Sequence, residues 1–245
     1  SDTNLSASGN AYIFSLANSS IQIGATTLAD GAYFTIGSGS ANPISLSSIS
    51  GTAGGSSSNI TINTTGAVTV SGAIGTDIGT LTITNSGGTT FSSTVNATTV
   101  TLTNTTGTIA FNGALTATTL NTAAQAYNLA LNASSGTITN AVSMINTGTV
   151  TLGSSGGTLA FSGGLTATAP SAITVNGTIT AAGTGVITLG DSDTGVTVAS
   201  SATIGGTSTG AITLGAATFA NRATLTVGTG IANTISLSSV TGTAL

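Results

Sequence analysis

The feature that most constrains the fold of this chain is a long internal repeat. Residues 215–245 (GAATFANRATLTVGTGIANTISLSSVTGTAL) align without a gap with residues 24–54 (GATTLADGAYFTIGSGSANPISLSSISGTAG), at an offset of 191 residues. Of the 31 aligned positions 18 are identical, and most of the others are conservative exchanges such as Ile36 with Val227. Self-similarity of this kind is typical of repeat architectures, in which each unit contacts only its neighbours.

Short runs in which apolar and polar residues alternate recur from one end of the chain to the other. The runs are residues 21–23, 60–62, 68–70, 81–83, 100–102, 129–131, 150–152, 173–175, 187–189, 196–198, 212–214, 225–227 and 235–237. A two-residue period built from β-branched residues predicts strands with one buried face. No apolar stripe has the 3.6-residue period of a helix, so the sequence predicts an all-β protein.

Shorter repeats indicate how the strands are arranged. Three blocks return at offsets of 25, 50 and 69 residues: residues 184–190 and 209–215, residues 107–118 and 157–168, and residues 79–89 and 148–158. These offsets are near multiples of about 20–25 residues, a period expected of solenoids. We therefore predict a parallel β-helix (β-solenoid) with coils of about 20–25 residues, in which Phe111 and Phe161 point inward. The threonine between two apolar neighbours is expected to point outward.

We expect one continuous solenoid over residues 1–245, with a divergent N-terminal segment at residues 1–20 and equivalent repeats at residues 24–54 and 215–245. The alternative is a pair of antiparallel sandwiches. Sandwich sequences rarely repeat at several nested offsets, and they usually carry the Trp, Lys and Glu residues that are missing here. The repeats therefore favour the solenoid.

Charged residues are nearly absent, which removes several classes of function. They form 2% of the chain, against about 25% in an ordinary globular domain, and comprise five Asp and one Arg. There is no basic patch for nucleic acid and no cationic amphipathic face for lipid headgroups. No run approaches 18 apolar residues, so no membrane insertion by a helix is expected. Without His, Cys, Lys or Glu, conventional catalytic constellations cannot be assembled, and we expect neither an enzyme nor a bound cofactor.

Three stretches resemble the repeat arrays of very large secreted bacterial surface proteins. They are residues 128–142 (NLALNASSGTITNAV), residues 147–180, which begin TGTVTLGSSGGTLAF, and residues 233–244 (NTISLSSVTGTA). The similar proteins are β-strand-repeat proteins related to filamentous-haemagglutinin and autotransporter-passenger adhesins. The resemblance implies a right-handed parallel β-helix that is exported to the cell surface or the extracellular space. There it would act in adhesion, or as a filament, sheath or matrix fibre.

One pair of acidic residues is a weak candidate for calcium. Asp191 and Asp193 stand at positions i and i+2, so both carboxylates can share one face of a turn. Calcium usually takes 6–8 oxygen ligands, and no third acidic residue follows. The other interpretation is a solvated corner of the solenoid.

Threonine pairs of the form Thr-x-Thr are common, as in Thr80-Leu81-Thr82 and Thr99-Val100-Thr101. Outward pairs in register on a flat face would resemble the ice-binding faces of β-helical antifreeze proteins, and ice binding is a minor alternative function. Threonine is also the polar residue best suited to an outer strand face. The spacing between the pairs is irregular, which argues against a continuous flat array.

The lack of charge also bears on assembly. Strand edges are normally protected by Lys, Pro or inward charges, and this chain has almost none. Terminal repeats of soluble monomers are atypical, whereas residues 215–245 copy an internal segment. We therefore predict that the coils continue into further repeats or stack end to end with copies of the same chain, forming a neutral extracellular filament or sheath. The predicted assembly residues are Gly215, Thr226, Ile235 and Leu237 at one end and Ile21 and Ile23 at the other.

The alternative function is an adhesin stalk or passenger module that binds cell-surface glycans. Such a module would need a loop that interrupts the coil period. The candidates are residues 122–128, which contain Gln125 and Tyr127, and the divergent region at residues 12–14. Neither combines an aromatic residue with an acid, the grouping typical of a sugar site.

Overall fold

The computed structural model describes residues 12–14, 20–37, 39, 41–153, 156–229 and 232–243. The chain is an all-β parallel β-solenoid of about 10 turns, with ~22 residues per coil and no helix. Every alternating run predicted from the sequence lies within a strand, so the predicted fold class and coil length are confirmed. The chain divides into two compact units, residues 1–120 and residues 121–245, and each is described by itself.

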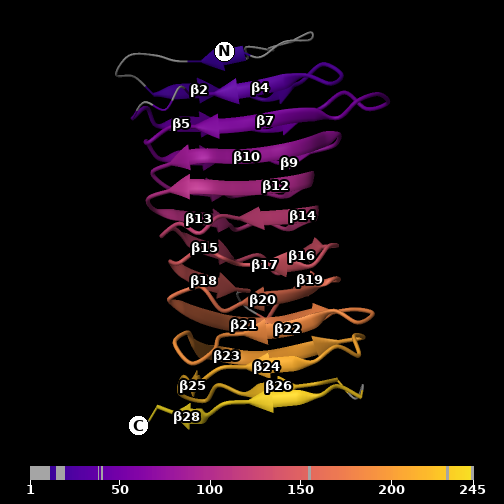
Figure 1. Cartoon of the computed structure of the whole chain (residues 1–245). Helices are drawn as coiled ribbons and strands as arrows, with labels where there is room; N and C mark the ends of the chain where they lie inside the picture. Colours follow the sequence, from indigo (N-terminus) through magenta and orange to yellow (C-terminus); the bar gives the residue numbers. More distant parts are fainter. Residues whose placement is uncertain are drawn as a thin grey trace. The chain divides into compact units, whose positions relative to one another are not determined.

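In the first unit, strands of successive coils lie one upon another (Figure 1). Their parallel pairing forms three ladders. The β4 ladder contains β1 (Tyr12–Phe14), β4 (Tyr33–Ile36), β7 (Ser58–Asn63), β10 (Ile78–Ser86) and β12 (Val95–Thr105). The β5 ladder contains β2 (Ile21–Ile23), β5 (Ile44–Leu46), β8 (Val68–Val70), β11 (Thr89–Phe91) and β13 (Thr108–Phe111). The β6 ladder contains β3 (Thr26–Thr27), β6 (Ile49–Ser50), β9 (Ile74–Gly75) and the start of β12. Strand β14 (Leu115–Thr122) follows β13.

The second unit repeats this arrangement with its own three ladders. The β28 ladder contains β15 (Asn128–Leu131), β18 (Thr149–Leu152), the first part of β21 (Ala172–Ala181), the first part of β23 (Gly195–Gly206), β25 (Ala217–Phe219) and β28 (Val240–Gly242). The β26 ladder contains β16 (Ser135–Ile138), β19 (Thr158–Phe161), the second parts of β21 and β23, and β26 (Leu225–Val227). The β27 ladder contains β17 (Val142–Ser143), β20 (Gly164–Ala167), β22 (Val186–Leu189), β24 (Ile212–Leu214) and β27 (Ile235–Leu237).

The core of each unit consists of apolar side chains stacked coil upon coil. Along β21, alternate residues are buried, as the two-residue period predicts. Phe91 and Phe111 are register partners, and their rings stack with centroids 4.8 Å apart and planes 9° apart. Both predicted inward aromatics are confirmed, because Phe111 and Phe161 are buried. At most of these positions an apolar residue stacks on an apolar residue, and the buried threonines Thr26 and Thr89, opposite Ile49 and Ile109, are exceptions.

A buried polar residue followed two positions later by glycine forms one corner of several coils. Thr64 donates its hydroxyl to the Asn42 carbonyl oxygen at 2.6 Å, and its Oγ1 accepts from the Gly66 amide at 3.0 Å. Ser208 does the same with the Gly185 carbonyl and the Gly210 amide, at 2.6 and 2.9 Å. A Cβ at Gly66 would lie 2.5 Å from the Asn42 carbonyl oxygen, so the coils approach too closely here for any other residue.

The 191-residue repeat is reproduced in the strand pairing. Ile21 pairs with Ile44 and Thr26 with Ile49 in the first unit, and the residues 191 positions later, Ile212 with Ile235 and Ala217 with Val240, pair identically. The turns match as well: the Ala32 amide donates to the Ala29 carbonyl at 3.0 Å, and the Ala223 amide donates to the Ala220 carbonyl at 3.0 Å. Strands β4, β5 and β6 are therefore the structural counterparts of β26, β27 and β28.

Two of the shorter offsets are not whole numbers of coils, contrary to prediction. The 25-residue offset does join successive coils, because Ile187 pairs with Ile212. Residues 107–118, however, begin on β13 of the β5 ladder, whereas residues 157–168 begin on β19 of the β26 ladder and reach the β27 ladder only at β20. The 69-residue offset likewise moves a peptide from β10 in the β4 ladder to β18 in the β28 ladder. The same peptide fits different ladders because all three bury alternating apolar residues.

Candidate functional site

The coil formed by β26, β27 and β28, here called the open rung, exposes apolar side chains that elsewhere in the molecule are buried. Ile235 and Leu237 are each 45% exposed and Val240 is 54% exposed, while Leu225 and Val227 are half-buried. Among the described residues, each of the three strands pairs on one side only: β26 with β23, β27 with β24 and β28 with β25. The open rung is therefore an apolar surface bordered by three strand edges.

The corresponding coil of the first unit, formed by β4, β5 and β6 and here called the covered rung, shows what such a surface contacts when another coil follows. Strands β7, β8 and β9 pair with it, placing Ile44 opposite Val68, Leu46 opposite Val70 and Ile49 opposite Ile74. The backbone amides of Ile44 and Ile49 donate to the carbonyl oxygens of Ala67 and Ala73, each at 2.9 Å. The covering coil thus supplies both apolar contacts and backbone hydrogen bonds.

The predicted assembly residues fall into two groups. Ile235 and Leu237 lie on the open rung, and Thr226 is exposed on the outer face of β26. Gly215 is buried, and a Cβ there would lie 2.7 Å from the Asp191 amide nitrogen. At the other end Ile21 is only 3% exposed and Ile23 is half-buried. The Ile21 side chain is therefore already packed in the core, and it offers no exposed apolar surface in the described residues.

Val240 also belongs to the open rung, and so do Leu225 and Val227 at its edge, although the sequence argument did not select them. Their signal was present in the alignment, because they stand 191 residues after Ile49, Phe34 and Ile36. All three of those residues are buried in the first unit.

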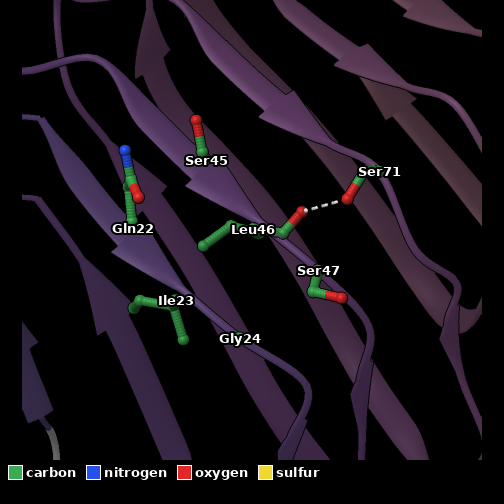
Figure 2. A pocket seen from close by; sticks show the side chains of 7 residues that line it. All are labelled: Gln22, Ile23, Gly24, Ser45, Leu46, Ser47 and Ser71. Carbon is green, nitrogen blue, oxygen red and sulfur yellow. Dashed lines mark hydrogen bonds between the residues drawn. The ribbon is translucent and has the colours of Figure 1, made fainter. Parts of the chain in front are cut away.

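A shallow hollow of about 570 Å³ lies beside the strands of the β5 ladder (Figure 2). It is lined by Gln22, Ile23, Gly24, Ser45, Leu46, Ser47 and Ser71. Ser71 donates its hydroxyl to the Leu46 carbonyl oxygen at 3.1 Å, which fixes one side of the hollow. The lining has neither a charged group nor an aromatic ring, and its side chains offer only amide, hydroxyl and aliphatic groups.

The calcium candidates Asp191 and Asp193 lie in one exposed turn. Asp191 Oδ1 accepts hydrogen bonds from the backbone amides of Asp193 and Thr194, both at 2.9 Å. Ser192 donates its hydroxyl to Asp193 Oδ1 at 3.3 Å. These contacts match a solvated corner, in which an aspartate side chain closes its own turn. In the part of the chain that the structure describes, no three acidic, histidine or cysteine residues gather as a metal site would need.

Outward threonines align more regularly than their sequence spacing indicated. Thr151, Thr174, Thr197, Thr218 and Thr241 are successive register partners in the β28 ladder. This column consists mostly of single threonines and does not depend on the irregularly spaced Thr-x-Thr pairs. No second threonine column runs beside it among the described residues of this ladder. The outward residue two positions before Thr151 is Thr149, but its partners in the next two coils are Ala172 and Gly195. A narrow column of this kind differs from the broad two-dimensional array that an ice-binding face requires.

Tyr127, proposed as part of a glycan-binding loop, is fully buried. Its hydroxyl accepts a hydrogen bond from the Ala123 backbone amide at 3.1 Å. Burial raises the pKa of the Tyr127 phenol above its ordinary value, and hydrogen bonds with Ala123 and Thr122 oppose this rise. Tyr127 is therefore a core residue, and the prediction that it is available to a ligand is wrong. Residues 12–14, the other candidate, form β1.

Comparison with known proteins gives no family for this chain. No protein-family model matches it, no curated protein matches it and no solved structure matches it. Among the described residues no helix has the length and hydropathy needed to cross a membrane.

Proposed function

We propose that this protein is a structural element of a neutral extracellular filament, sheath or matrix fibre, extended by stacking further coils on the open rung. The observation that carries the proposal is the exposure of Ile235, Leu237 and Val240, whose counterparts Ile44, Leu46 and Ile49 are 1–2% exposed. Export to the cell surface rests on the resemblance to secreted bacterial repeat proteins, as does the right-handed winding of the coils.

Hydrophobic burial and backbone pairing favour such stacking. Covering three half-exposed aliphatic side chains contributes about 2–4 kcal/mol, and unpaired strand edges are templates for a further strand. Association between separate molecules costs at least about 4 kcal/mol of translational and rotational freedom. Stacking between chains should therefore be weak and concentration-dependent, whereas a coil joined to the same chain avoids that cost.

Sedimentation velocity and electron microscopy over a range of protein concentrations test the proposal. We expect end-joined oligomers at high concentration, and their loss in the Ile235→Lys, Leu237→Lys double variant because inward charges block an apolar strand surface. The matched control is Thr197→Lys, which adds a charge on the exposed outer face of β23. Dispersed monomers at every concentration would contradict the proposal, and so would equal loss of oligomers in the control.

The alternative function, an adhesin module for cell-surface glycans, has support from one exposed aromatic residue. Tyr33 is 61% exposed and is the register partner of Asn59, whose own partner along the ladder is Thr80. An aromatic face beside amide and hydroxyl groups can contact a sugar ring. Binding of the protein to a glycan array, lost in Tyr33→Ala and retained in Tyr127→Phe, would favour this function over the filament.

A further inference from the structure

We propose that the open rung is an acceptor for one kind of occupant, a parallel coil with the chemistry of residues 55–77 of this same repeat, in which Asp77 is the one charged residue. The inference rests on the proposed function and specifies the partner of that site. The molecule contains its own template, because residues 24–54 form the covered rung and the segment that follows them covers it.

The register of the occupant follows from the covered rung. Val68 and Val70 lie opposite Ile44 and Leu46, and Ile74 lies opposite Ile49. The counterparts of those three acceptor residues are Ile235, Leu237 and Val240. An occupant must therefore place two apolar side chains inward on one strand, with a polar residue such as Thr69 between them, and a third apolar side chain on the next strand. A shift of one residue would turn its polar side chains inward.

The hydrogen bonds between neighbouring coils fix the direction of the occupant. The Ile21 amide donates to the Pro43 carbonyl at 2.9 Å, the Ile44 amide to the Ala67 carbonyl at 2.9 Å and the Ile212 amide to the Thr234 carbonyl at 2.9 Å. In each case a strand donates to the coil that follows it in sequence. The Ile235 amide is the next donor in this series, so a parallel coil with a carbonyl at the position of Ala67 satisfies it. An antiparallel strand would not reproduce the pattern.

The open rung itself offers no charged side chain to its occupant. No charged residue lies within residues 223–245, and the nearest, Arg222, is exposed in the turn that precedes β26. Arg222 occupies the place of Gly31, where a Cβ would lie 3.3 Å from the Ser56 Cβ of the covering coil. The Arg222 Cβ therefore requires the occupant to shift slightly at this corner. Glycine at position 222 has no Cβ and would remove the need for this shift.

The test is to extend the chain with its own covering coil. Residue 245 aligns with Gly54, so residues 55–77 can be added directly after it in the correct phase. Leu245→Gly is included because Gly54 has a φ of 110°, which other residues rarely adopt. We expect backbone amides of residues 235–240 to exchange hydrogen at least about tenfold more slowly in the extended chain, as measured by mass spectrometry. Residues 44–50 serve as the internal reference in the same sample.

The control is an extension of equal length with Val68→Ser, Val70→Ser and Ile74→Ser in the added copy, which should leave exchange at residues 235–240 as it is in the parent. A second variant tests the register: Ser236→Cys with Thr69→Cys in the added copy should form a disulfide, because Ser45 and Thr69 are register partners and the chain has no other cysteine. Adjacent parallel strands lie about 4.8 Å apart, within the range that a disulfide spans.

Unchanged exchange in the extended chain, or equal protection by the serine-substituted extension, would overturn the inference. Its failure is distinguishable from failure of the filament proposal. If the extension protects the rung but the parent chain never forms oligomers, the acceptor stands and self-stacking between chains is wrong. If the parent chain forms end-joined oligomers and the extension gives no protection, the assignment of residues 55–77 as the model of the occupant is wrong.

Discussion

The covered rung and the open rung have nearly the same sequence but opposite environments. Strands β5 and β27 have the same three-residue sequence, Ile-Ser-Leu, yet Leu46 is 2% exposed and Leu237 is 45% exposed. Both rungs keep the same pairing with the coil before them. In a solenoid, then, the burial of a residue depends on whether a coil follows it, and the local sequence specifies only which side of the strand is apolar.

The largest expected difference between the rungs is in the cost of removing a core side chain. Leu46→Ala should destabilise the protein by about 2–5 kcal/mol, because it leaves a cavity under β8. Leu237→Ala should cost about 1 kcal/mol or less, because this side chain is already half exposed to water. Urea unfolding followed by circular dichroism measures both values. Equal costs would mean that the open rung is covered in solution.

The closeness of the covering coil can be probed at two of its glycines. Gly66→Ala should cost about 1–3 kcal/mol, since a Cβ would meet the Asn42 carbonyl at 2.5 Å. Gly75→Ala is the matched control in the same coil, because a Cβ there has no neighbour within 4 Å. Thermal unfolding of the two variants gives the comparison. A tolerated Gly66→Ala would show that the coil sits less tightly on the covered rung than the contacts indicate.

Alkaline pH should weaken the second unit for a reason unrelated to its open rung. The folded state raises the pKa of Tyr127 above its ordinary value of 10.0. The stability that its neutral form contributes is therefore complete below pH 10 and is lost as the pH rises through the folded-state pKa, by up to about 1.4 kcal/mol per pH unit.

Hydrogen exchange between pH 9 and 11, corrected for the intrinsic rate, would follow this loss in peptides around residues 123–131. Tyr127→Phe should abolish the pH dependence while retaining the ring in the core. A dependence that persists in Tyr127→Phe would have to come from another group.

The smallest effect is expected at the turn before each rung. Gly31 and Arg222 occupy equivalent positions with φ of 64° and 62°, a region that costs a non-glycine residue about 1 kcal/mol. Arg222→Gly should therefore stabilise the second unit by about 0.5–1 kcal/mol, and Gly31→Arg should destabilise the first by at least as much. Paired melting curves measure both, and a change of the same sign in the two variants would contradict the equivalence of the turns.

Much of the fold could be predicted from local pattern, because a strand with one buried face leaves a direct record in its sequence. The run Ile173-Thr174-Val175 and its equivalents all lie in strands, and Phe111 and Phe161 are buried. The prediction that repeated peptides occupy equivalent positions in stacked coils was wrong for the 50- and 69-residue offsets. Residues 107–118 and 157–168 are similar because every ladder requires the same alternation of buried apolar and outward polar residues. Sequence similarity alone therefore does not identify the ladder that a peptide occupies.

The candidate site was predicted only in part, for a related reason. Ile21 and Ile235 carry the same pattern, yet Ile21 is packed in the core and Ile235 is exposed, and that difference lies in the neighbouring coils. Tyr127 was misassigned because a tyrosine in a polar stretch suggested a surface loop, while its hydroxyl is in fact bound to the Ala123 amide. The corner glycines Gly66 and Gly210 did carry a sequence signal, a Ser or Thr two residues before each glycine and a strand after it.

The corner hydrogen bonds described for Thr64 and Ser208 run one way, from each coil to its predecessor. Asn233 continues the series, donating from Nδ2 to the carbonyl oxygens of Ser208 and Gly210 at 2.8 and 2.7 Å. At these corners a coil therefore carries the side chains that bind it to the coil before it, while its strand amides donate to the coil that follows. The chain can therefore gain or lose one whole coil without sequence changes in the adjacent coils. An insertion of a fraction of a coil would move the corner residues of every later coil out of register.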